Sequence, residues 1–263
     1  MSGAVKATIL GCGPSGGIPT IAEGWGDCDP NEPRNRRLRP SIMVEKGAAR
    51  VLVDTSPDLR QQLLNVGVNR LSAVLYTHAH ADHLHGIDDL RGVNKVMKAP
   101  IDVYADAETV RHLTQRFEYA TTPLPAAAKM YYKPVLDVHE IAPGQRFQVG
   151  GLDILAFDQD HGYSRTLGFR FGPLAYSTDL LDLPEDSFKA LDGVHTWIIG
   201  VFSLKAHWTH AHVEKALDWV ARVKPARAVL THLGPSIDYG RLSRSLPKGV
   251  EAAYDGMVIE AQD

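Results

Sequence analysis

The sequence has little cysteine, no long apolar run and no excess of positive charge. Its 263 residues include two cysteines, Cys12 and Cys28, which are too few for a disulfide framework in a chain of this size. No stretch approaches the roughly 18 apolar residues that span a bilayer, and the N-terminus lacks the basic start and apolar run of a secretory signal. These absences predict a cytoplasmic protein whose cysteines stay reduced and serve the structure.

The charge balance excludes a second group of functions. The formal net charge is −3, so the chain has no global positive field of the kind that gathers nucleic acid or an anionic membrane. We therefore expect no stable nucleic-acid partner and no membrane partner. Apolar residues at 44% and charged residues at 22% are typical of a globular protein and exclude a disordered one.

Short strand-type runs alternate with helical segments along the chain. No fixed-period repeat or low-complexity tract interrupts them, which predicts a single α/β domain over residues 1–263. Residues 11–17 form a Gly-rich turn, and residues 18–39 and 119–134 are expected to be long loops, which are usually functional or mobile. Strands are expected at residues 7–10, 41–45, 51–54, 73–76, 101–104, 152–157, 167–171, 197–199 and 228–230, and helices at 57–66 and 212–223.

A histidine cluster follows the expected strand at residues 73–76, in the run Thr77-His78-Ala79-His80-Ala81-Asp82-His83. Open α/β sheets place ligands at the carboxyl ends of their strands. Imidazole and carboxylate together suit zinc, manganese or iron better than calcium or magnesium, and burying such donors without partners would cost several kcal/mol. In a tight loop, His78 and His80 can point to one side while Asp82 and His83 point to another, which favours two metal ions over one.

These residues resemble the metallo-β-lactamase superfamily, whose signature His-x-His-x-Asp-His is present at residues 78–83. Further segments resemble one subgroup, the phosphodiesterases of the bacterial carbon–phosphorus lyase pathway, and more distantly tRNase Z. They are residues 10–19 (LGCGPSGGIP), 54–60 (DTSPDLR), 85–91 (HGIDDLR) and 254–257 (YDGM). The resemblance implies an α/β fold, a four-layer αββα sandwich of the metallo-β-lactamase type, and a metal-dependent hydrolase.

The resemblance also implies the remaining metal ligands, His161, Asp179 and His232. Each follows a strand-like run, which agrees with a place on the same rim of the fold. The first expected ligand set is His78, His80 and His161, and the second is Asp82, His83 and His232. Asp179 would bridge two divalent transition-metal ions, zinc or manganese, because a shared anion offsets the repulsion between the cations. Taken alone, Asp179 could instead be a turn carboxylate at a strand end.

His210 is the expected catalytic residue beyond the ligands, and Asp82 is assigned a catalytic role as well as its place in the metal site. By the resemblance, His210 reaches the site from the start of the helix expected at residues 212–223 and acts as an acid or an oxyanion clamp. An ordinary imidazole pKa near 6.5 suits a proton donor at physiological pH. His207 and His212 compete with it for contact with substrate.

Two further segments could hold a phosphate. The Gly-rich turn offers backbone N–H donors, so Ser15 and Gly16 are expected to contact substrate. The basic run at residues 34–39 is typical of a solvated loop, with phosphate steering by one or two of its arginines as the alternative.

The expected reaction is hydrolysis of a small phosphodiester, either a cyclic phosphate or a nucleotide-like ester, by a water activated between two metal ions. One rival is a thioester, lactone or lactam hydrolase on the same fold, since fold and metals do not choose the bond that is broken. Another is a non-hydrolytic member that binds a ligand or, with iron, performs redox chemistry. A third, tRNA processing, needs an RNA-holding arm or a basic patch, and the sequence indicates neither. The resemblance alone suggests a homodimer.

Overall fold

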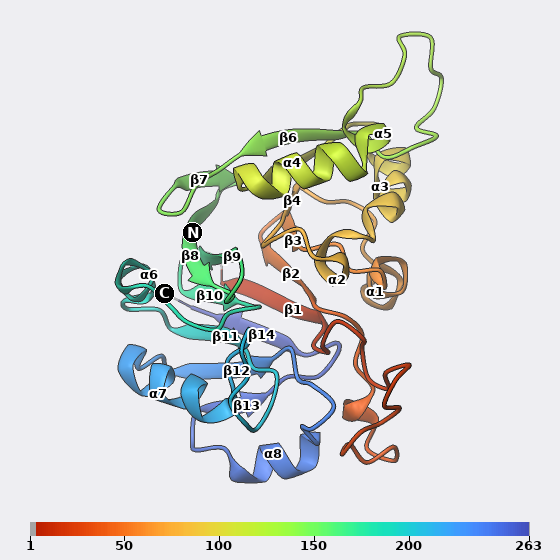
Figure 1. Ribbon diagram of the computed structural model, residues 1–263. Coiled ribbons are helices and arrows are strands. Elements are labelled where there is room, and N and C mark those ends of the chain that lie inside the picture. The colour runs from red at the N-terminus through yellow and green to blue at the C-terminus, as the bar shows by residue number, and fades with distance from the viewer. Residues whose placement is uncertain (1–3, 263) are drawn as a thin grey trace.

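Two seven-stranded sheets pack face to face in the computed structural model, which describes residues 4–262 (Figure 1). The first sheet contains β1 (Val5–Gly11), β2 (Ser41–Lys46), β3 (Ala49–Val53), β4 (Ala73–Leu75), β5 (Ile101–Ala105), β6 (Leu136–Glu140) and β14 (Val258–Ala261). The second contains β7 (Arg146–Val149), β8 (Leu152–Asp160), β9 (Arg165–Phe171), β10 (Leu174–Ser177), β11 (Thr196–Gly200), β12 (Arg227–Thr231) and β13 (Val250–Ala252). The strand orders are β14-β1-β2-β3-β4-β5-β6 and β13-β12-β11-β10-β9-β8-β7.

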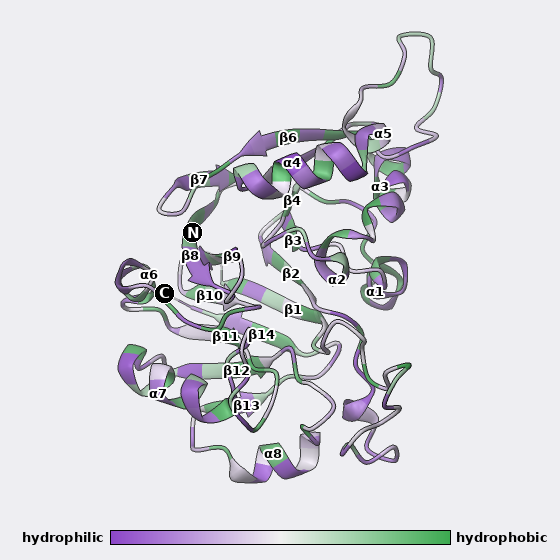
Figure 2. Ribbon diagram, in the orientation of Figure 1, coloured by the Kyte–Doolittle hydropathy of each residue, from purple (hydrophilic) through white to green (hydrophobic). Residues whose placement is uncertain are grey.

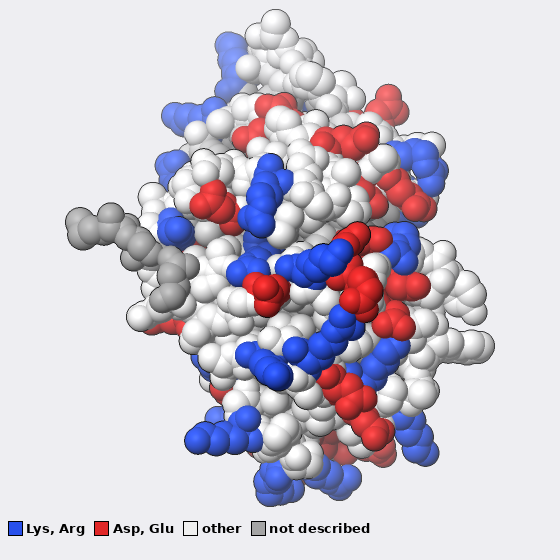
Figure 3. Space-filling model, turned by 90° about the vertical axis from the view of Figure 1, so that its left-hand side faces the viewer, with Lys and Arg blue, Asp and Glu red and all other residues white. Residues whose placement is uncertain are grey.

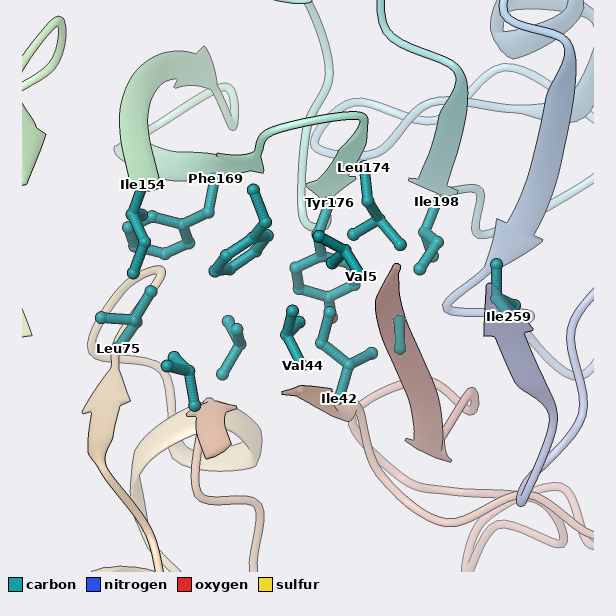
Figure 4. Packing of buried hydrophobic residues seen from close by; sticks show 14 of the residues in the cluster. Val5, Ile42, Val44, Leu75, Ile154, Phe169, Leu174, Tyr176, Ile198 and Ile259 are labelled. Carbon is teal, nitrogen blue, oxygen red and sulfur yellow. The ribbon is translucent and has the colours of Figure 1, made fainter. Parts of the chain in front are cut away.

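The central strands are apolar on both faces, and this double burial builds the layers. In β10, Leu174 and Tyr176 face the other sheet while Ala175 packs toward the helices, because successive strand residues point to opposite faces. Figure 4 shows the layer between the sheets, where Ile42 and Val44 lie opposite residues of the second sheet. Each sheet therefore has one face in a shared core and one face for helices.

Helices cover both outer faces. Their bounds are α1 (Leu59–Val66), α2 (Ala81–Leu84), α3 (Leu90–Met97), α4 (Ala107–Arg116), α5 (Glu118–Thr121), α6 (Glu185–Leu191), α7 (Val213–Val223) and α8 (Tyr239–Ser245), with short 3-10 helices at Pro33–Asn35 and Ile87–Asp89. Apolar residues of α1, α3 and α4 pack on the first sheet, and those of α6, α7 and α8 pack on the second. In Figure 2, α4 and α7 alternate between hydrophobic and hydrophilic residues, as expected for helices with one buried face. The expected four-layer αββα sandwich is confirmed.

Several boundaries differ from the sequence expectations. The helix expected from residue 57 begins at Leu59, and the one expected from residue 212 begins at Val213 with His212 as its N-cap residue. The loop expected at residues 119–134 starts with a turn of α5, and the rest of it projects away from the body beside α5 (Figure 1). An arm of this kind was not expected from the sequence. Within residues 4–262, no helix is both long and apolar enough to cross a membrane.

Parallel strand pairing sets the position of the site. β3 pairs in parallel with β4, and β10, β11 and β12 pair in parallel with one another. Their carboxyl ends therefore share one edge in each sheet. The backbone N–H of Leu167 donates to the carbonyl of Thr77 (2.9 Å), which ties the second sheet to the end of β4. The two edges form one rim of the molecule.

Candidate metal centre

The strand ends at this rim bring together all of the side chains expected to bind metal. His78, His80, Asp82 and His83 follow β4, His161 follows β8, Asp179 follows β10 and His232 follows β12. All of them except His80 are buried. Each sheet thus supplies part of the cluster, at the carboxyl ends where the sequence expectations placed it.

The cluster divides into two groups that share Asp179. The groups are His78, His80, His161 and Asp179, and Asp82, His83, Asp179 and His232; within each group the candidate ligand atoms lie within 4.8 Å of one another. Oδ2 of Asp179 lies 3.7 Å from Nε2 of His78 and 3.7 Å from Nε2 of His161. Its Oδ1 lies 3.2 Å from Nε2 of His83 and 3.1 Å from Nε2 of His232. One carboxylate therefore faces both groups, one oxygen to each.

Hydrogen bonds on the far side of the rings fix which nitrogen faces the cluster. Nδ1 of His161 donates to the carbonyl of Thr209 (2.7 Å), because a carbonyl can only accept. Nδ1 of His83 is 2.6 Å from a carboxylate oxygen of Asp54, and Nδ1 of His78 is 2.9 Å from the hydroxyl of Thr77. With Nδ1 engaged in this way, Nε2 is the nitrogen that faces the cluster, and it can bind a metal once it carries no proton.

The free nitrogens provide a test of whether a metal fits. Nε2 of His78, His83 and His232 is buried and has no hydrogen-bond partner among the described residues. Buried polar atoms are normally satisfied, and leaving several of them unpaired in one place costs free energy. Imidazole nitrogens and carboxylate oxygens at this spacing are the donors that divalent transition metals take. The residues present fit such an ion.

Asp54 is a site residue to which the sequence reasoning assigned no role. It follows β3, is fully buried, and accepts hydrogen bonds from the backbone N–H and the hydroxyl of Thr77 (both 2.8 Å) as well as from His83. A carboxylate behind a ligand histidine fixes the tautomer and the ring orientation. Its position at the end of a buried strand was the available signal.

Backbone strain is concentrated at this rim. Asp54, Asp179 and His232 have φ values of 65°, 48° and 59°, in the left-handed region that residues other than glycine seldom adopt. Each follows a strand, and each turns its side chain back toward the cluster. Such strain costs of order 1–3 kcal/mol per residue and persists only where the surroundings enforce it, which is typical of functional sites.

The electrostatics of the cluster are those of closely spaced opposite charges. Burial lowers the pKa of His78 well below its usual value. Burial alone would raise the pKa of Asp179, but His232 and His83 outweigh it and hold that pKa well below the usual range. Burial likewise acts to lower the pKa of His83, yet Asp179, Asp82 and Asp54 raise it well above normal. The two carboxylates that face the cluster, Asp82 and Asp179, are therefore ionised and ready for cations.

His210 joins the cluster, but not from the helix. It lies in the loop before α7, with its ring centroid 4.8 Å from that of His161 and 5.0 Å from that of His232. The helix start lies three residues further along, because α7 begins at Val213 with His212 as its N-cap residue. Burial is the main reason that the pKa of His210 falls to about 3, which contradicts the expectation of an ordinary imidazole pKa. At neutral pH His210 is an uncharged hydrogen-bond donor.

The competing histidines lie farther out. The ring of His207 is 5.4 Å from that of His210, and its Nδ1 accepts a hydrogen bond from the backbone N–H of Thr209 (3.3 Å). His212 caps α7 and pairs with Ser203 through a backbone bridge. Contact of His207 or His212 with substrate stays a prediction.

The Gly-rich turn lies beside the second group of ligands, since Leu233, next to His232, donates its N–H to the carbonyl of Cys12 (2.7 Å). Three of its N–H groups are not free, contrary to expectation: Gly13 donates to the carbonyl of Leu38 and Gly17 to that of Pro14 (both 2.8 Å), and Cys12 donates to a carboxylate oxygen of Asp255 (2.9 Å). Ser15 and Gly16 are exposed, and their role as substrate contacts stays a prediction.

The arginines of residues 34–39 are engaged within the protein. Arg37 is buried and donates to backbone carbonyls of residues 233, 234 and 237. Arg39 pairs with Asp58 (2.7 Å), Arg36 lies over the ring of Trp25, and Arg34 lies over the rings of two tyrosines. These contacts favour a structural role over phosphate steering. Both cysteines are buried and free, in agreement with a structural role.

A small hollow opens beside the first group of ligands. It has a volume of about 180 Å³ and is lined by His78, His80, His112 and Arg116 among others. Arg116 is held there by a hydrogen bond to the carbonyl of Ala79 (2.8 Å). A larger hollow of about 820 Å³ lies elsewhere, around Phe147 and Pro173, and includes none of the candidate ligands. The smaller hollow therefore gives access to the first group of ligands, on the side of the exposed His80.

Two comparisons with known proteins agree on the family of this chain. The Beta-lactamase superfamily domain matches residues 49–233. A crystal structure of a new diphosphatase from the PhnP family is 31% identical, with a TM-score of 0.90 over 99% of this chain and 98% of that one.

Two curated relatives extend the comparison. An octanoyltransferase of Porphyromonas gingivalis is 30% identical over 258 residues, 96% of this chain and 51% of that protein. A ribonuclease Z of Mycobacterium sp. (strain KMS) is 27% identical over 259 residues, 85% of this chain and 90% of that protein. This chain spans about half the length of the first curated relatives that it matches.

Proposed function

The chain belongs to the β-lactamase superfamily and, within it, to the PhnP family, and on this basis we propose that it is a metal-dependent phosphodiesterase. The proposed substrate is a cyclic phosphate or a nucleotide-like small phosphodiester, and the proposed cofactors are two divalent transition-metal ions, zinc or manganese. The observation that carries the proposal is the position of Asp179, whose two oxygens face two separate groups of histidines.

The residues of the chain have distinct roles in this proposal. His78, His80 and His161 would hold one ion, Asp82, His83 and His232 the other, and Asp179 would bridge them. Ions bound there supply positive charge to the non-bridging phosphoryl oxygens and make a water more acidic. Asp54 and Thr209 orient ligand rings, and the buried surroundings exclude bulk water, which strengthens every charge interaction at the site.

His210 is proposed to bind a phosphoryl or leaving-group oxygen. Its ring lies against rings from both groups of ligands, and in its neutral state it donates one hydrogen bond. A fixed donor aimed at developing negative charge lowers the barrier without giving up its proton. We therefore propose that His210 acts as an oxyanion clamp and not as a general acid.

The names of the relatives support phosphorus chemistry over acyl chemistry. A diphosphatase and a ribonuclease Z both cleave bonds to phosphorus. The match to this chain covers 98% of the diphosphatase and 90% of the ribonuclease Z. The octanoyltransferase matches only over 51% of its length, so its name describes a larger protein. Thioester, lactone or lactam hydrolysis is therefore the alternative that the assay must include.

The proposed partner is a small molecule, with no membrane and no stable nucleic acid, and a homodimer is the proposed assembly. On the face shown in Figure 3, basic and acidic side chains are interspersed and do not form a continuous basic surface. The projecting residues 122–133 and the ribonuclease Z relatives keep tRNA processing as a second candidate.

The test is a comparison of substrates under one metal loading. Metal analysis should find about two ions per chain, and His80→Ala, an exposed position, should lose at least one of them. kcat/KM is then measured for a cyclic ribose phosphate, a chromogenic phosphodiester, a thioester, a cephalosporin and a precursor tRNA. We expect kcat/KM for the small diesters to exceed that for the other substrates by at least roughly tenfold, which is about 1.4 kcal/mol in transition-state binding. A thioester, lactam or tRNA that exceeds both diesters by that factor would replace the proposal.

A further inference from the structure

Two large aromatic side chains lie exposed on the loops that carry the candidate metal centre. Tyr163 is 86% exposed, two residues after His161, and Trp208 is 74% exposed, two residues before His210. Single exposed apolar residues are common, but two large rings beside a buried polar centre mark a surface suited to binding. Neither ring has a part in the proposed chemistry.

The two loops are joined to each other. The carbonyl of Thr209 accepts the hydrogen bond from His161, and a Cβ built on Gly162 would lie 2.8 Å from the carbonyl oxygen of Trp208. Gly162 also has a φ of 82°, so a residue with a side chain there would both strain the backbone and push the loops apart. The close approach holds Tyr163 and Trp208 on adjoining segments.

A series of rings leads from the buried cluster to Trp208. Ring centroids are 5.0 Å apart between His232 and His210, 5.4 Å between His210 and His207, and 6.4 Å between His207 and Trp208. Phe202 packs against the middle of the series, 5.1 Å from His210 and 4.9 Å from His207. Trp208 thus lies at the exposed outer end of a series of neighbouring rings that begins at His232, a candidate metal ligand.

We propose that Trp208, assisted by Tyr163, forms a subsite that stacks on a flat ring of the substrate. The phosphodiester would then carry a nucleobase or a ring of similar shape, joined to the phosphate through a sugar. Aromatic side chains bind bases of any sequence by stacking, because every base has a π-face. The assignment of the phosphodiester rests on the proposed function, whereas the ring subsite rests on these contacts.

The test pairs ligands that differ only in the ring. Binding of adenosine 5′-monophosphate and of ribose 5-phosphate to the metal-loaded protein is measured by calorimetry, and KM and kcat are measured for adenosine 2′,3′-cyclic phosphate and for methyl riboside 2,3-cyclic phosphate. The variants are Trp208→Ala, Trp208→Phe and Tyr163→Ala. Leu204→Ala is the control, since Leu204 is 56% exposed in the same loop and belongs to no ring contact of the series. Metal content is measured for each variant.

Trp208→Ala should raise the Kd and the KM of the base-bearing ligands roughly tenfold and leave kcat and the ring-free ligands nearly unchanged. Tyr163→Ala should act in the same direction but less, Trp208→Phe should restore most of the binding, and the control should behave as wild type. An equal loss of affinity for the base-bearing and the ring-free ligand of a pair, or no change in either affinity, would overturn the subsite. If no diester is cleaved while nucleotide binding still depends on Trp208, the subsite stands and the proposed function fails. If both diesters are cleaved and Trp208→Ala changes neither Kd nor KM, the proposed function stands and the subsite fails.

Discussion

At the scale of single residues, Asp54 orients a ligand of the second group from the first sheet. Its carboxylate holds Nδ1 of His83 at 2.6 Å, and partners of this kind commonly contribute 10- to 100-fold to metal affinity, as an order of magnitude. We predict that Asp54→Asn weakens binding of the second metal by about that factor while the fold is kept, because asparagine tolerates the left-handed backbone that Asp54 adopts. Competition with a chelator measures the affinity. Asp137→Asn, on the exposed side of β6, is the control, and equal affinities in the two variants would contradict the role.

His210 gives a second prediction at this scale. His210→Ala should keep its metal and lose turnover by a factor of roughly 10²–10³, the usual effect of removing one donor to a developing charge. His210→Gln, which keeps an N–H donor, should recover part of the loss. Loss of metal from the alanine variant would instead make His210 a ligand. A glutamine variant as slow as the alanine variant would favour proton transfer over a hydrogen bond.

The ligands themselves could be predicted from the sequence through its resemblance to a known family, whereas the contact of Asp54 with His83 could not. His161, Asp179 and His232 each follow a strand-like run, so local patterning places them at one edge. The contact between Asp54 and His83 spans 29 residues of chain, and only the parallel pairing of β3 with β4 brings the two side chains together. The depressed pKa of His210 was equally out of reach, because it depends on burial by several distant segments.

At the scale of elements, the long loop between β1 and β2 is anchored by one buried guanidinium. Arg37 donates to the carbonyls of Leu233 (3.1 Å), Gly234 (3.4 Å) and Ile237 (2.8 Å), so it holds this loop against the segment after His232. Arg37→Met would remove these hydrogen bonds, and the carbonyl of Leu233 would lose its donor. We expect the free energy of unfolding to fall by about 3 kcal/mol and the Tm by roughly 6–12 °C.

Arg36→Met is the matched control for this variant, because Arg36 is exposed and lies over the ring of Trp25. Thermal unfolding of both variants is followed by circular dichroism at the same metal concentration. A Tm for Arg37→Met equal to that of the control would show that the loop is held by other contacts.

The end of the same loop is tied to α1 by an ion pair, which gives the stability a pH dependence. Burial would raise the pKa of Asp58, but hydrogen bonds from Arg39 outweigh it and lower that pKa below its usual value. A carboxyl with a lowered pKa in the folded state stabilises the protein above the unfolded pKa near 3.9, and the contribution is lost as the pH falls through the folded value.

We therefore predict that Asp58→Asn lowers the free energy of unfolding by about 1 kcal/mol at neutral pH, and that the difference from wild type shrinks below about pH 4. Denaturant titrations of wild type and variant at roughly pH 7, 5 and 3.5 measure the two free energies of unfolding. Asp186→Asn, in an exposed pair with Lys189, should show no such difference. A constant difference at all three pH values would contradict the role of the charge.

The strands that the sequence predicted include those that are buried on both faces. β2, β3, β11 and β12 were expected within a few residues of their observed bounds, since continuous apolar runs identify them. β6 was not expected, because it lies at the edge of its sheet and exposes Asp137 and Glu140. Its assignment depends on pairing with β5, which local sequence does not encode.

At the scale of the whole molecule, the candidate metal centre joins the two sheets. Each group of ligands takes side chains that follow β4 of the first sheet and side chains that follow strands of the second. Bound metal should therefore stabilise the entire fold, by about 2.7 kcal/mol per site when free metal is 100 times the Kd. Two sites together contribute about 5.4 kcal/mol at that loading, so we predict that a chelator lowers the Tm by roughly 10–20 °C and that zinc or manganese restores it.

His80→Ala serves as the control for this prediction, since His80 is exposed and its loss leaves the core intact. Added metal should raise the Tm of that variant by less than it raises the Tm of wild type. Identical melting of wild type with and without chelator would mean that the sheets are held together without help from the ions.

The pairing of the outermost strands has a consequence for how the chain can be connected. Val5 of β1 lies opposite Ala261 of β14, so the two ends of the described chain leave the molecule side by side. The other end of β1 leads to the Gly-rich turn beside His232, a full strand length away. A neighbouring domain could be fused at either terminus, or the termini linked and new ones opened in the projecting loop, while the rim stays clear. The fold can therefore be joined to another protein through the edge formed by β1 and β14.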